Sequence, residues 1–197
     1  MTRIPGFASA VAVLCITAAC SLWPAQPPAP QLHDFGPLPV LLKNQASAAL
    51  TMVSATAPAW LAHDAIHYRL LYDDRTALRS YADHRWAAPP ADLLGARLED
   101  MLALGSVDDS GSHSGYALSI ELLEFEQDFT SVHDAQVHLE LQVSLRRPGD
   151  GRVIAQRRFV MTQATSADVQ GAISGLAQLA DQASTAIAQW ARTQTHE

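Results

Sequence analysis

Histidine and cysteine are the residue types in this chain best suited to metal or nucleophilic chemistry, and the chain has eight histidines and two cysteines. His63 and His67 have the i, i+4 spacing with which a helix presents two imidazoles to one metal ion. The segment from Ala65 onward instead has the pattern of a β-strand, in which residues four positions apart stand about 13 Å apart. We therefore expect no metal site at this pair.

Serines flank a histidine in the segment Gly111-Ser112-His113-Ser114-Gly115, a combination that suggests nucleophilic catalysis. Neighbours in sequence do not have the geometry of a catalytic triad, and the sequence lacks the pattern of a nucleophile elbow. We interpret the segment as a solvated loop. The chain also has no phosphate-binding or dinucleotide-binding glycine motif. We therefore expect no catalytic residues, no metal and no dissociable cofactor, and we interpret the chain as not an enzyme.

The thiol of Cys20 is the group for which the neighbouring sequence predicts a reaction. Arg3 supplies a positive charge near the N-terminus, and an apolar run follows over residues 7–19. At 13 residues, this run has the length of the core of an export signal and is too short to cross a bilayer as a helix. We therefore expect residues 1–19 to be removed as a signal peptide.

Residues 16–20 resemble the bacterial lipobox, with Thr17 at the position where leucine is usual. This resemblance implies that the thiol of Cys20 receives a diacylglycerol and that the new N-terminus receives an N-acyl group, which anchors the chain in a membrane. Ser21 stands where an aspartate would retain a lipoprotein in the inner membrane, which implies delivery to the periplasmic face of the outer membrane of a Gram-negative bacterium. The alternative is an ordinary signal peptide without acylation, cut for instance after Ala25 or after Ala19.

The rest of the chain divides into a tether and one domain. Residues 20–39 contain six prolines and are interpreted as an extended, acylated tether. Residues 40–197 have the length of a single domain. Cys15 leaves with the signal peptide, so the mature chain has no disulfide. The formal net charge of −7 gives no electrostatic basis for binding nucleic acid.

Hydrophobic periodicity predicts two halves that each consist of three strands and a helix. Residues 135–145 alternate between apolar and polar side chains, and Leu123 and Phe125 fall out of phase with the strand before them, which predicts a bulge or a strand buried on both sides. Pro148 to Gly151 has the composition of a hairpin turn. The expected strands are about 48–55, 66–72, 77–86, 116–125, 135–145 and 152–162, and the expected helices run from Pro90 to before Gly105 and from Val169 to Trp190.

This order predicts an α+β fold with a mostly antiparallel sheet in two β-β-β-α halves and two helices packed on one face. Ser166 or Asp168 is expected to cap the second helix, and Gly171 and Gly175 are expected to permit its close packing on the sheet. The other face of the sheet is expected to be polar along residues 136–146 and to be either solvent-exposed or a docking surface.

Four segments together resemble the ABC-type transport auxiliary lipoprotein family, which includes the small lipoprotein of the paraquat-inducible system. The resemblance covers the chain from about His33 to Trp190, and the lipobox supports it. The segments that carry it are His33 to Pro37, Ala57 to Leu61, Ile66 to Arg69 and Tyr81 to Pro90.

The resemblance implies a non-enzymatic lipoprotein that works beside an MCE-domain periplasmic protein and an ABC permease in phospholipid transport, with a homo-oligomeric ring left open as an arrangement. Trp60 lies beside Pro58 in an expected loop and is the candidate partner-binding residue, because tryptophan is enriched at binding hot spots. Two alternatives remain open from the sequence. One is an outer-membrane assembly or cell-wall adaptor lipoprotein, and the other is a secreted lipoprotein hydrolase.

Overall fold

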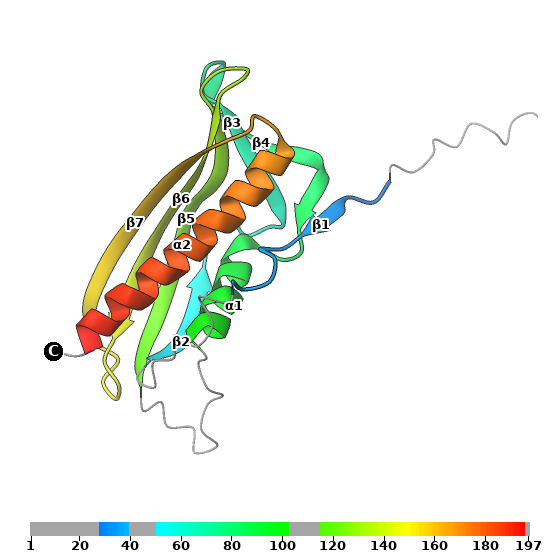
Figure 1. The fold of residues 1–197 in the computed structure, drawn as a ribbon. Coiled ribbons are helices and arrows are strands. Elements are labelled where there is room, and N and C mark those ends of the chain that lie inside the picture. Colours follow the sequence, from blue (N-terminus) through cyan, green and yellow to red (C-terminus); the bar gives the residue numbers. More distant parts are fainter. Residues whose placement is uncertain (1–27, 40–49, 103–114, 196–197) are drawn as a thin grey trace, which may run out of the picture.

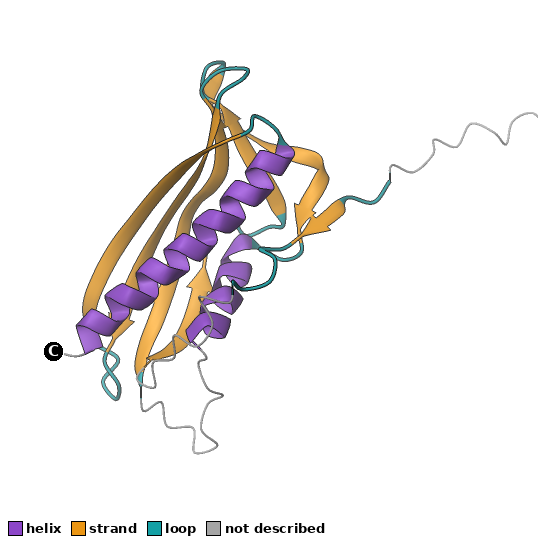
Figure 2. Ribbon diagram, viewed as in Figure 1, coloured by secondary structure: helices purple, strands orange, loops and turns teal. Residues whose placement is uncertain are grey.

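The computed structural model describes residues 28–39, 50–102 and 115–195. Both helices of this part of the chain lie on one face of a single curved sheet, and α2 runs along most of the length of that sheet (Figures 1 and 2). In chain order, the elements are β1 Gln31–His33, β2 Leu50–Thr56, β3 Ala65–Leu70, β4 Asp74–Trp86, α1 Pro90–Leu102, β5 Tyr116–Phe129, β6 Ala135–Arg146, β7 Val153–Thr165 and α2 Val169–Thr195.

The sheet is mixed, so the prediction of an α+β fold with two helices on one face is confirmed, but a mostly antiparallel sheet is wrong. Its strands are ordered β1-β4-β3-β5-β6-β7, and β2 also pairs with β5. Three pairs are antiparallel, namely β3 with β4, β5 with β6 and β6 with β7. Three are parallel, namely β1 with β4, β2 with β5 and β3 with β5. The long strand β5 is shared, because β2 pairs with its first half and β3 with its second half.

The second half of the chain builds the main core. The apolar residues of β6 are buried and face the helices, as their alternation predicts. The turn that follows β6 contains Gly149 and Gly151 at φ values of 88° and 64°, a region that favours glycine. At the start of α2, the Gly171 amide donates a hydrogen bond of 2.7 Å to Oδ1 of Asp168, which therefore caps the helix.

Close packing of α2 on the sheet depends on a glycine, Gly175, in the helix. A β-carbon built on Gly175 would lie 2.5 Å from Cγ2 of Thr165 and 2.9 Å from Cγ2 of Val137. The expected role of this glycine in helix–sheet packing is thus confirmed. Further along α2, Ile187 is fully buried and Trp190 is 8% exposed, with the Trp190 ring packed edge-on against Phe159.

A bulge in the middle of β5 changes which side chains face the helices. The register with β6 shifts between Leu122 and Glu124, so Leu123 is the extra residue and the predicted bulge is confirmed. Leu122 faces the core before the bulge, and Phe125 faces the core after it. By alternation, Glu124, Glu126 and Asp128 then lie on the opposite, helix-free face of the sheet.

The first ordered strand lies inside the segment that the sequence assigns to the tether. β1 pairs with the end of β4, and Phe35 is buried against Trp86 with their rings edge-on at 5.4 Å. The guanidinium of Arg97 donates hydrogen bonds to the carbonyl oxygens of Phe35 and Gly36 at 2.6 and 2.8 Å. The fold therefore begins by Gln31, earlier than the expected boundary after residue 39.

Candidate functional site

The predicted functional residues fall in different parts of the chain. Cys20 lies outside the described residues, as does most of the serine–histidine segment 111–115. Trp60 lies in the turn between β2 and β3 and is 38% exposed. Its indole packs edge-on against the imidazole of His67, with ring centroids 6.1 Å apart. The ring of this tryptophan is therefore partly exposed, and a partner for it stays a prediction.

The two histidines of the sequence pair have different environments. His63 lies in the loop before β3 and is exposed, whereas His67 lies within β3 and is 8% exposed. Burial lowers the pKa of His67, although a hydrogen bond to the carbonyl oxygen of Arg79 opposes the decrease. His67 stands opposite Glu126 of β5 and therefore lies on the helix-free face. Through its contact with His67, the Trp60 ring lies at the border of that face.

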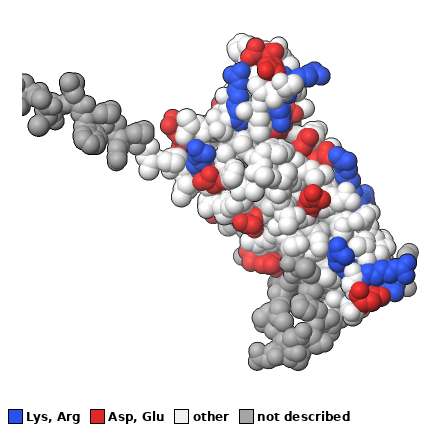
Figure 3. Space-filling view, turned by 180° about the vertical axis from the view of Figure 1, so that it is seen from behind, with Lys and Arg blue, Asp and Glu red and all other residues white. Residues whose placement is uncertain are grey.

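The helix-free face of the sheet is a polar surface. Acidic and arginine side chains are interspersed over it, without a large area of one charge (Figure 3). It includes the polar positions of β6, which the sequence identified as either solvent-exposed or a docking surface. Val160 of β7 adds a 56% exposed apolar side chain. We call this surface the open face.

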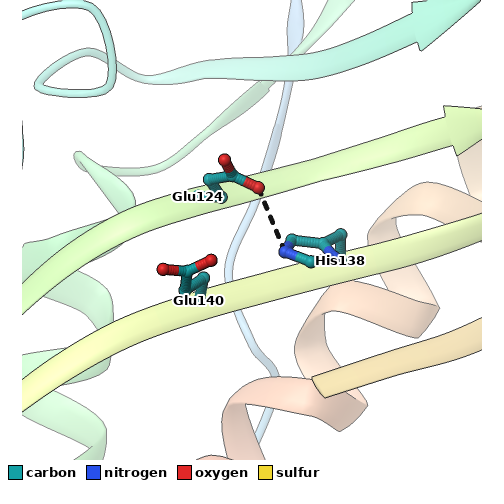
Figure 4. Close-up of side chains that lie close together, drawn as sticks. All are labelled: Glu124, His138 and Glu140. Atoms are coloured by element: carbon teal, nitrogen blue, oxygen red, sulfur yellow. Dashed lines mark ion pairs between the residues drawn. The ribbon is translucent and has the colours of Figure 1, made fainter. Parts of the chain in front are cut away.

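Five charged or titratable side chains gather at the centre of the open face, where Glu124 stands opposite Glu140 and Glu126 stands opposite His138. His138 Nε2 lies 3.0 Å from a carboxylate oxygen of Glu124 (Figure 4). We call Glu124, Glu126, Asp128, His138 and Glu140 the carboxylate cluster.

Two arginines contact the carboxylate cluster from the neighbouring strands. Arg69 of β3 donates a 2.6 Å hydrogen bond from Nε to Glu126. Arg158 of β7 forms an ion pair with Glu140, and its side chain is 61% exposed. The cluster and these two arginines together span four adjacent strands, with the arginines at the two sides.

Burial dominates the electrostatics of this cluster. It raises the pKa of Glu126, which is only 3% exposed, and the nearby charges of Asp128 and Glu124 oppose the lowering effect of Arg69. Burial also raises the pKa of Asp128, although His138 and Arg69 act in the opposite direction. Both carboxyl groups therefore lack full compensation for the loss of water.

Sequence reasoning did not identify the carboxylate cluster. His138 and Glu140 were recognised only as polar positions of an alternating strand. Their proximity to Glu124 depends on the bulge and on the register between β5 and β6. The available signal was the run of acidic residues at every second position after Leu123, together with the predicted bulge.

Two grooves lie away from the open face. One, of about 200 Å³, is lined by residues that include Phe35, Leu93 and Arg97. The other, of about 250 Å³, lies at the end of α2 and is lined by residues that include Phe159 and Trp190. Both are below the volume of about 300–1,000 Å³ that is typical of small-molecule pockets. These two grooves therefore do not have the size of a site that encloses a lipid.

Comparisons with known structures show a shared fold. A crystal structure of a DUF330-family protein from Xanthomonas campestris is 24% identical, with a TM-score of 0.65 over 86% of this chain and 96% of that chain. A crystal structure of an uncharacterized protein is 17% identical, with a TM-score of 0.60 over 82% of this chain and 98% of that chain. At these identities, the similarity concerns the fold alone. A search of the curated proteins finds no match.

The family assignment rests on most of the domain. Within the described residues, no helix has the length and apolar character needed to cross a bilayer, and the lipid attachment expected at Cys20 lies outside them. The sequence profile that matches residues 31–188 covers β1 through most of α2. The chain belongs to the family of ABC-type transport auxiliary lipoprotein components.

Proposed function

We propose that this chain is a non-catalytic subunit of an MCE-type phospholipid transport system, which links a periplasmic MCE assembly to the outer membrane. The family membership supports a role beside an ABC-type transporter. The observation that carries the proposal is the open face, with Trp60 exposed at its border. This face is the surface on which the MCE-domain protein docks.

The open face has features of a protein-binding surface. Trp60 offers a large ring that packs edge-on against His67, and tryptophan is common among binding hot spots. At one side of the sheet, the 13-residue strand β7 has no further strand partner among the described residues. An edge of this kind can add a strand from a neighbouring chain. Docking therefore does not require a basic patch or a deep pocket.

The proposed anchor places a limit on where the domain works. Ten residues separate Cys20 from β1, and a chain of that length spans at most about 36 Å when fully extended. Acyl groups on Cys20 would therefore keep the domain within that distance of the periplasmic face of the outer membrane. The MCE assembly would then reach the domain from the periplasm.

Co-purification from membranes tests the docking surface. Tagged full-length protein, extracted in detergent, is expected to capture the MCE-domain protein. Trp60→Ala is expected to weaken this capture by at least about tenfold, because removing a hot-spot side chain typically raises the binding free energy by 2 kcal/mol or more. Trp60 is 38% exposed and lies in a turn, so the variant should keep the wild-type fold, which circular dichroism checks.

Tyr72→Ala is the matched control for this experiment. Tyr72 is also an exposed aromatic residue, at 48%, but it lies in the turn between β3 and β4 at the far end of β3. This variant is expected to capture the MCE-domain protein as the wild type does. Absence of any MCE-domain protein from the wild-type eluate, or equal loss in both variants, would contradict the proposed docking through Trp60.

A further inference from the structure

The centre of the open face brings together ligand types that divalent transition metals prefer. Glu124, His138 and Glu140 each offer one ligand atom, and these three atoms lie within 4.8 Å of one another (Figure 4). Zinc binds imidazole nitrogen and carboxylate oxygen at about 2.0–2.2 Å in tetrahedral geometry, which places neighbouring ligand atoms about 3.4 Å apart. Small rotations of the two glutamate side chains would close the remaining difference.

A second observation comes from the neighbouring residue Glu126. It stands opposite His138, is 97% buried by residue surface, and has a carboxylate oxygen, Oε2, with no hydrogen-bond partner among the described residues. Oδ1 of Asp128 is buried without such a partner as well. A buried carboxylate oxygen without a donor is unfavourable by about 1–3 kcal/mol or more. Two such oxygens within one cluster mark a place where a positive charge would be stabilised.

Charge balance indicates how large that positive charge would be. The carboxylate cluster contains four carboxylates, and the guanidinium groups of Arg69 and Arg158 supply two positive charges. With all four carboxyl groups ionised and His138 neutral, which is the state that binds a metal ion, the net charge of this group is −2. A divalent cation would neutralise it, whereas a single further arginine or lysine would not.

We propose that Glu124, His138 and Glu140 bind one divalent cation of the zinc type on the open face. The side chain of Glu124 is 48% exposed, so the fourth coordination position faces solvent and takes a water molecule or a side chain of a partner. Mixed nitrogen and oxygen ligands favour zinc over magnesium, which prefers six oxygen ligands. Glu126 adds negative charge beside the ligands.

Arg158 competes with the cation for Glu140. Its guanidinium contacts the Glu140 carboxylate, but its side chain is 61% exposed and is free to turn into solvent. Cation binding is therefore expected to displace Arg158 rather than to disturb the strand. This competition predicts that removing the arginine improves binding, which distinguishes this site from unspecific binding to surface histidines.

Zinc titration of the full-length protein in detergent, without a histidine tag, tests the proposal. The wild type is expected to bind one equivalent of Zn²⁺ in isothermal titration calorimetry, and Mg²⁺ is expected to bind far more weakly. His138→Ala and Glu140→Gln should each weaken zinc binding by at least about tenfold. Arg158→Ala should strengthen it. Circular dichroism checks that each variant keeps the wild-type fold.

His133→Ala serves as the matched control, because His133 is an exposed histidine in the turn between β5 and β6 and lies outside the cluster. It should bind zinc as the wild type does. The proposal is overturned if the wild type binds no zinc, if His138→Ala binds it unchanged, or if Arg158→Ala binds it more weakly. None of these outcomes depends on whether an MCE-domain protein is captured.

Discussion

Replacing Trp190 with alanine tests whether the apolar stripe of α2 belongs to the core or is a surface for a partner. The indole lies near the end of α2, is 8% exposed, and packs edge-on against Phe159 with ring centroids 6.2 Å apart. The guanidinium of Arg157 also lies over the Phe159 ring, 5.0 Å from its centre. Removing the indole would therefore leave a cavity between the end of α2 and β7.

The expected loss of stability follows from this burial. Replacing a buried tryptophan or phenylalanine with alanine typically lowers the free energy of unfolding by about 3–5 kcal/mol. Trp190 lies within the last two turns of α2, where the helix can relax into the cavity, so we expect the lower value of about 3 kcal/mol. For a domain of this size, 1 kcal/mol shifts the melting temperature by about 2–4 °C. The variant should therefore melt about 6–12 °C below the wild type.

Thermal unfolding followed by circular dichroism measures this difference, and the adjacent residue provides a control. Gln189 is exposed on the same helical turn, so Gln189→Ala should change the free energy of unfolding by no more than about 0.5 kcal/mol. If Trp190→Ala melts within about 2 °C of the wild type, the end of the helix does not stabilise the domain. The stripe would then have to be reassigned as a partner surface.

Two further predictions concern the N-terminal end of the chain. Cys20→Ala should release the protein from the membrane fraction or block cleavage of the signal peptide, as mass spectrometry and fractionation would show, and a wild type without the mass of acyl groups would refute lipidation. The ring of His33 stacks on that of His84, and burial together with the charge of His84 lowers the pKa of His33. The folded state therefore binds this proton less tightly than the unfolded chain. In urea unfolding, the wild type should keep its full stability above a pH of about 6.5 and lose part of it on acidification below that pH. His33→Gln should lose less stability over the same pH range. An unaltered pH profile in that variant would show that His33 does not contribute.

The sequence pattern was sufficient to predict the elements that keep the same side chains facing the core along their whole length. β6 alternates without interruption between the helix side and the open face, and α2 keeps one apolar stripe over its length. The glycines of the turn after β6 and the cap at Asp168 are determined by nearby residues. Periodicity and turn chemistry report such local preferences directly.

Strand pairing could not be predicted in the same way, because alternation indicates which face a side chain occupies and does not indicate which strand lies beside it. β2 and β3 were expected to be consecutive members of an antiparallel meander, yet both pair with β5 in parallel. β1 was not predicted, because its three residues lie in a proline-rich segment and depend on the edge of β4 for their hydrogen bonds. Each of these arrangements depends on contacts between residues far apart in the sequence.

The carboxylate cluster was missed for a related reason, and its origin connects the core to the open face. Leu123 is the extra residue in β5, and the phase change that it causes turns Phe125 toward the core, where it packs against Phe35 and Trp86 with ring centroids 5.8 Å apart in both pairs. The same phase change turns Glu124 and Glu126 to the other face of the strand. Without the bulge, these carboxylates would point into the apolar core, which is strongly unfavourable for unpaired charges. The packing of Phe125 and the position of the carboxylate cluster are therefore two consequences of one inserted residue.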